Sequence, residues 1–106
     1  MCLTDGAPDG GWKTIFDDLT ITRVTQAELE TRDPELRTKA GGYFYNPHTK
    51  KGEALISKES TYHERDVVCH EIGHHVLKKK GVKNDALGLE ALVNELAAVS
   101  CDGWLK

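Results

Sequence analysis

Hydrophobic and polar residues alternate along two parts of the chain, as they do in half-buried β-strands. Residues 19–25 place Leu19, Ile21 and Arg23 on one side, and β-branched residues are frequent there. Residues 42–58 hold two further apolar runs, which the turn-forming residues 46–52 separate. The pattern therefore predicts a strand over 19–25 and a β-hairpin over 42–58.

Helical periodicity and capping signals mark three other stretches. Thr25 and Glu28 match a capping box and predict a short helix over 26–31. Thr61 and Glu64 match a second box before a long periodic stretch, which predicts a helix over 62–80 closed by Gly81. A last amphipathic helix is expected over 86–101. Asn84 or Asp85 would cap it, and Gly103-Trp104 would end it.

These elements predict a small α+β fold. We expect a mostly antiparallel sheet of about three strands, packed on the two long helices. Residues 1–11 are rich in Gly, Asp and Pro, which is typical of a flexible leader, so residues 12–106 would form a single minimal domain.

Composition narrows the classes of function. The 106 residues carry a net charge of −3, with 39% hydrophobic and 29% charged residues. This balance disfavours nucleic acid and anionic membranes as partners. Neither a secretory signal nor an apolar run of spanning length is recognisable, so a cytoplasmic protein is expected. The odd number of cysteines, Cys2, Cys69 and Cys101, does not suggest a disulfide framework, and reduced thiols are expected.

The candidate chemistry lies in the long helix, at His70-Glu71-Ile72-Gly73-His74. Two histidines four residues apart lie one helical turn apart on the same face, so one nitrogen of each can bind the same ion. Glu71 can reach a water beside that ion. Catalytic zinc sites built on H-E-x-x-H combine two such histidines, a third protein ligand and a carboxylate next to the water.

The third ligand is expected on the last helix, because no Cys- or His-rich stretch follows His74. His75 is next in the helix and should point away. The carboxylates that remain are those of Glu90 and Glu95.

Together these segments resemble the gluzincins, zinc peptidases that carry H-E-x-x-H on one helix and a glutamate ligand on the next. Asn94-Glu95-Leu96-Ala97-Ala98 is similar to the segment that holds the third ligand in several members, and twenty residues lie between His74 and Glu95. Glu90 with Asn94 resembles a smaller group that includes repressor-cleaving regulatory peptidases. Of the two, Glu95 is preferred. The size of the chain is similar to that of the minimal single-domain members, the minigluzincins.

The resemblance implies a zinc-dependent endopeptidase. His70, His74 and Glu95 (alternatively Glu90) would bind Zn²⁺, Glu71 would act as general base, and an extended peptide would bind at the sheet edge. Two features depart from the family. Val99 occupies the position where many members carry an acidic residue that orients a ligand histidine, so Asp102 or Asn94 would have to take that role.

The other departure concerns stabilisation of the oxyanion that forms during peptide hydrolysis. Many family members supply a downstream His, Tyr or Arg for this role, but none of these residues follows residue 75. A stabilising group would have to come from upstream; the candidates are Tyr43, Tyr45, His48, Tyr62, His63 and Arg65.

The alternative function is a latent or non-catalytic zinc-binding module, used for folding or partner recognition. Such a site would be closed by a fourth ligand such as Cys2, Cys101 or Asp102. In a third reading the motif is accidental and no metal binds.

Overall fold

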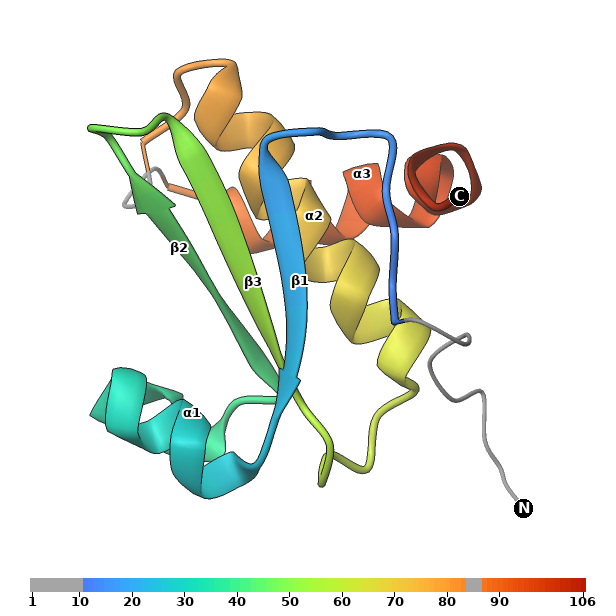
Figure 1. The fold of residues 1–106 in the computed structure, drawn as a ribbon. Coiled ribbons are helices and arrows are strands. Elements are labelled where there is room, and N and C mark those ends of the chain that lie inside the picture. The colour runs from blue at the N-terminus through green and yellow to red at the C-terminus, as the bar shows by residue number, and fades with distance from the viewer. Residues whose placement is uncertain (1–10, 84–86) are drawn as a thin grey trace.

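Three strands form one mixed sheet in the computed structural model, which describes residues 11–83 and 87–106 (Figure 1). They are β1 (Leu19–Val24), β2 (Gly41–Asn46) and β3 (Lys51–Ser57), in the order β1–β3–β2. The α+β class and the number of strands are confirmed. β2 and β3 form the predicted antiparallel hairpin, whereas β1 runs parallel to β3. The sheet is therefore mixed rather than mostly antiparallel, because the chain reverses direction twice between β1 and β3.

A short helical segment connects β1 to β2 and covers one end of the sheet. It consists of α1 (Gln26–Arg32) and a 3₁₀ helix, η1 (Pro34–Thr38). The predicted capping box at the start of α1 is present: the Thr25 hydroxyl accepts from the Glu28 backbone, and the Glu28 carboxylate accepts from the Thr25 backbone. Leu29 is fully buried against Val24 and Leu55, so α1 has its own small core on the sheet.

The two long helices lie on the face of the sheet opposite to the one that α1 contacts (Figure 1). α2 (Glu64–Lys79) packs Val67, Val68 and Ile72 against Ala54 and Ile56 of β3, and these residues form the main core. α3 (Leu89–Trp104) packs on α2 through a second cluster, made by Leu77, Leu89 and Val93. α2 is therefore the central layer, with the sheet on one side and α3 on the other.

The start of α2 differs from the expectation. The predicted capping box of Thr61 with Glu64 is wrong: the N-cap is His63, whose side chain makes no capping hydrogen bond. The Glu64 carboxylate is instead engaged with Trp12, whose Nε1 donates over 2.7 Å, and with Arg23 at 2.6 Å. Tertiary partners thus replace the local cap. At the other end Gly81 follows the helix with a φ of +89°, as its predicted role requires.

α3 begins at Leu89, later than predicted, after Gly88 at a φ of +77°. It extends to Trp104, which packs into the main core. The predicted caps, Asn84 and Asp85, lie outside the described residues, as do residues 1–10 of the predicted leader and with them Cys2.

A disulfide joins the two long helices. Cys69 of α2 and Cys101 of α3 are bonded, and their Cα atoms are 5.5 Å apart, an ordinary separation for a disulfide. The prediction of reduced thiols is therefore wrong for these two cysteines. The pairing was not predictable from the sequence, because the two residues are 32 positions apart and meet only through the packing of α3 on α2.

No helix in the described part of the chain is long and apolar enough to cross a membrane.

Candidate metal centre

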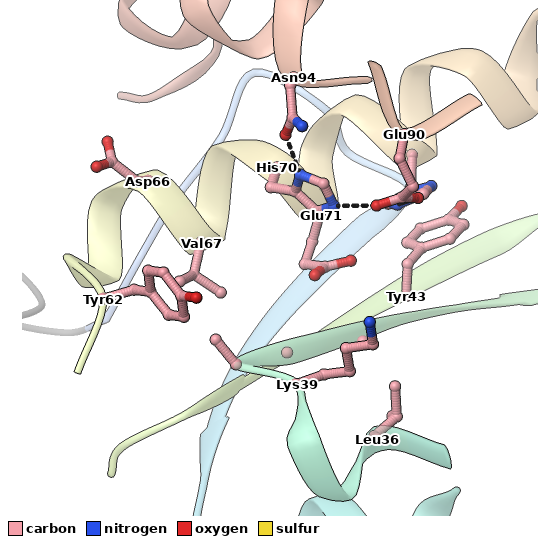
Figure 2. Close-up of a pocket in the computed structure, with 14 residues that line it drawn as sticks. Leu36, Lys39, Tyr43, Tyr62, Asp66, Val67, His70, Glu71, Glu90 and Asn94 are labelled. Carbon is pink, nitrogen blue, oxygen red and sulfur yellow. Dashed lines mark hydrogen bonds and ion pairs between the residues drawn. The ribbon is translucent and has the colours of Figure 1, made fainter. Parts of the chain in front are cut away.

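The helical geometry of α2 brings His70 and His74 together on the side of the helix that faces the start of α3. Their ring centroids are 5.0 Å apart. Both side chains are partly exposed, with 26% and 17% of their surface accessible to solvent. Ile72 and Val68 on the buried side fix the rotation of α2, so both rings line a cavity. Figure 2 shows the His70 ring there.

Glu90 of α3 completes the group. One carboxylate oxygen lies 3.1 Å from His70 Nε2, and the other lies 3.1 Å from His74 Nε2. These three side chains each offer one ligand atom, and the three atoms lie within 4.8 Å of one another. Two imidazole nitrogens and one carboxylate are a donor set that zinc uses in catalytic sites, and the convergence of both Nε2 atoms on one carboxylate fits such an ion.

The position of Glu90 follows from the rotation of α3. Glu90 and Asn94 are four residues apart and share the face that meets α2, whereas Glu95 is rotated by about 100° from Asn94. Glu95 is exposed and does not line the cavity. The structure therefore reverses the order of preference: it brings Glu90 to the histidines and leaves Glu95 away from them. The i, i+4 pairing of Glu90 with Asn94, parallel to that of His70 with His74, was the available signal in the sequence.

Asn94 orients one of the histidines. Its Oδ1 atom is 2.8 Å from His70 Nδ1, close enough to accept a hydrogen bond from the Nδ1–H group. With the proton at Nδ1, the lone pair of Nε2 points toward the cluster, which is the tautomer a metal ligand needs. Asn94 is therefore the residue that holds the His70 ring in this orientation. Asp102, the other candidate, forms an ion pair with Arg65.

Glu71 lies in the wall of the same cavity and is only 5% exposed. Burial, together with the nearby negative charge of Glu90, raises the pKa of Glu71 to about 8. Gly41 of β2 leaves room for this carboxylate, because a Cβ atom there would lie 3.2 Å from Glu71 Oε2 and 2.7 Å from the Leu55 carbonyl oxygen. A buried carboxyl group with a pKa near neutrality is suited to proton transfer.

The next histidine, His75, points away from the cluster, as predicted, and is fully buried. Its Nε2–H donates to Asp18 over 2.9 Å, and its Nδ1 accepts from the Tyr43 hydroxyl over 2.6 Å. Gly52 makes space for this contact, since a Cβ atom there would lie 2.6 Å from His75 Nδ1. The Tyr43 ring in turn lies nearly parallel to that of His74, with their centroids 6.4 Å apart. The network was not recognised in the sequence, because Asp18 is 57 positions from His75.

The cavity has a volume of about 670 Å³ and runs between α2 and the start of β2 (Figure 2). Of the upstream residues considered for oxyanion stabilisation, Tyr43 and Tyr62 line it, while Tyr45, His48, His63 and Arg65 do not. The Tyr43 hydroxyl is engaged with His75, so Tyr62 is the one whose hydroxyl makes no hydrogen bond among the described residues.

No protein-family model, curated protein or solved structure matches this chain. The resemblance to gluzincins therefore depends on the motif and on the arrangement of the site.

Proposed function

We propose that the protein is a zinc-dependent endopeptidase. The observation that carries the proposal is the convergence of His70, His74 and Glu90 beside the buried carboxyl group of Glu71, all at the surface of one open cavity. His70, His74 and Glu90 would hold the ion. Bound zinc would polarise a water molecule and the scissile carbonyl group.

Glu71 has the general-base role. Its carboxylate takes a proton from the attacking water and later passes that proton to the leaving amine. Asn94 keeps the lone pair of His70 Nε2 directed at the site. Tyr43, held by His75, packs beside the ring of His74 and restricts its movement.

The edge of β2 is the proposed docking place for an extended peptide. Within the described residues β2 pairs only with β3, so its other edge has unpaired backbone groups. The Ala40 carbonyl accepts from the Ser57 amide of the β3 side over 2.9 Å. The antiparallel register then turns the backbone groups of Gly41 and Tyr43 outward, toward the cavity side. A peptide strand added there would pass His70, His74 and Glu90.

Among the described residues no fourth ligand joins His70, His74 and Glu90, which favours this function over a closed structural zinc site. Two of the candidate fourth ligands are engaged elsewhere, Cys101 in the disulfide and Asp102 with Arg65. A cytoplasmic location stays a prediction, and the disulfide argues against it because such bonds are typical of oxidising compartments.

The test compares zinc binding with cleavage of a peptide library by the parent protein and by Glu71→Ala. We expect the parent to bind one zinc ion and to cleave peptides only when loaded. Glu71→Ala should retain zinc and lose hydrolysis. Zinc binding without cleavage by the parent would favour the latent module, and equal cleavage by Glu71→Ala would refute the assignment of the base.

A further inference from the structure

The cavity continues beyond His70, His74 and Glu90 toward the beginning of β2, and its two rims carry opposite charges. Leu36, Ala40 and Val67 give this part an apolar lining. Lys39 stands on the sheet side, just before β2, and Asp66 stands on the helix side, one turn before His70. A side chain of a bound peptide that enters here therefore meets an apolar floor between a cation and an anion.

Lys39 is the unusual member of this lining. It is the one lysine or arginine among the described residues around the cavity, where three carboxylates also lie: Asp66, Glu71 and Glu90. None of these carboxylates pairs with it, and its ammonium group makes no hydrogen bond or ion pair with any described residue. Figure 2 shows the Lys39 side chain extending from the sheet side with its amine directed toward α2 and the cavity. An unpaired cation that faces a binding cleft is available to a ligand.

We propose that Lys39 is a specificity-determining residue that pairs with an acidic side chain of the bound peptide. This inference rests on the proposed peptidase function. Lys39 precedes Gly41 by two residues, which in an extended chain is about 7 Å. A peptide that pairs with β2 near Gly41 therefore places a side chain within reach of Lys39 about two residues from the one that pairs with Gly41. Asp66 disfavours an acidic side chain on the opposite rim, so the preference is confined to the position beside Lys39.

The experiment uses peptides that are identical except for Glu, Gln or Lys at one position at a time within three residues of the cleavage site. The zinc-loaded parent should cleave the Glu peptide about two- to five-fold faster than the Gln peptide at one such position, the range expected for a single solvent-exposed ion pair. Lys39→Met should abolish the difference, and Lys39→Glu should reverse it in favour of the Lys peptide.

Lys58→Glu is the matched control, since Lys58 is exposed but does not line the cavity. It makes the same change in net charge and should keep the preference of the parent. If Lys39→Glu leaves the preference unchanged, or if Lys58→Glu alters it equally, the inference is overturned.

A binding measurement separates this inference from the proposed function. Fluorescence anisotropy of labelled Glu and Gln peptides is recorded with zinc-loaded Glu71→Ala and with its Lys39→Glu derivative. If the parent cleaves nothing, the proposed function fails, while a two- to five-fold binding preference that Lys39→Glu reverses still supports the role of Lys39. Equal binding of both peptides would overturn that role.

Discussion

At the scale of single residues, Glu90 has the most direct effect on the candidate metal centre, because its two oxygens contact both histidines. Glu90→Gln should weaken zinc binding by more than the 10- to 100-fold that loss of an outer-shell partner causes. Glu95→Gln is the matched control on the same helix and should bind zinc as the parent does. Titration against a chromophoric chelator measures both. A strong loss of zinc affinity in Glu95→Gln with little loss in Glu90→Gln would favour Glu95 as the third ligand.

Asn94 acts through His70 rather than on an ion. Asn94→Ala removes the acceptor for the Nδ1–H group, so the ring is free to rotate or to change tautomer, and zinc affinity should fall by about 10- to 100-fold. Asn94→Asp keeps an acceptor and should restore most of the affinity. The NMR signals of the His70 ring nitrogens would report the tautomer directly. Unchanged signals in Asn94→Ala would contradict the positioning role.

At the scale of elements, the disulfide fixes α3 against α2, and the three proposed ligands are divided between these helices. Closing a loop across 32 positions corresponds to about 3–4 kcal/mol of stability in the chain-entropy model. The double variant Cys69→Ser, Cys101→Ser should therefore unfold at lower denaturant concentration and bind zinc more weakly. Urea titration and zinc titration check this. Parental zinc affinity in the variant would mean that side-chain packing alone holds α3 in place.

The elements themselves were largely predictable from local signals. The periodicity and Gly81 defined α2, the alternation defined β1, and the turn residues defined the hairpin. The start of α2 was missed because the partners of Glu64 are Trp12 and Arg23, which are 52 and 41 positions away. The glutamate that lies beside the two histidines was misjudged because the choice relied on the distance along the chain from His74, whereas the i, i+4 pairing of Glu90 with Asn94 indicates the face of α3 that meets α2. Local chemistry thus predicted the elements, while long-range contacts determined the details of the site.

At the scale of the whole molecule, Asp18 connects the segment before β1 to α2. It accepts a hydrogen bond from His75 and pairs with Lys79. The hydrogen bond from Lys79 is the main cause that lowers the pKa of Asp18 from 3.8 to about 2. The folded state therefore binds the proton less readily than the unfolded state. This contribution is present above about pH 4 and is lost as the pH falls toward 2.

Asp18→Asn should reduce stability by about 1–2 kcal/mol at neutral pH, a value discounted because Lys79 is half exposed. Between pH 4 and pH 2 the variant should lose less additional stability than the parent. Asp17→Asn, at the exposed neighbouring position, is the control and should follow the parent. Urea unfolding at several pH values measures the three proteins. If the stability of Asp18→Asn and of the parent falls in parallel between pH 4 and pH 2, the loss of stability at acid pH does not come from protonation of Asp18.

The Cys69–Cys101 bond also encloses the site within a covalent ring. His70, Glu71, His74, Glu90 and Asn94 all lie between the two cysteines in the sequence. A single backbone cut inside the ring, for example by trypsin after the exposed Lys83, would open the chain without separating the pieces. If the site binds zinc as proposed, zinc-loaded protein that is nicked in this way should keep the ion while oxidised and release it when the bond is reduced. Mass spectrometry with zinc analysis would follow both steps.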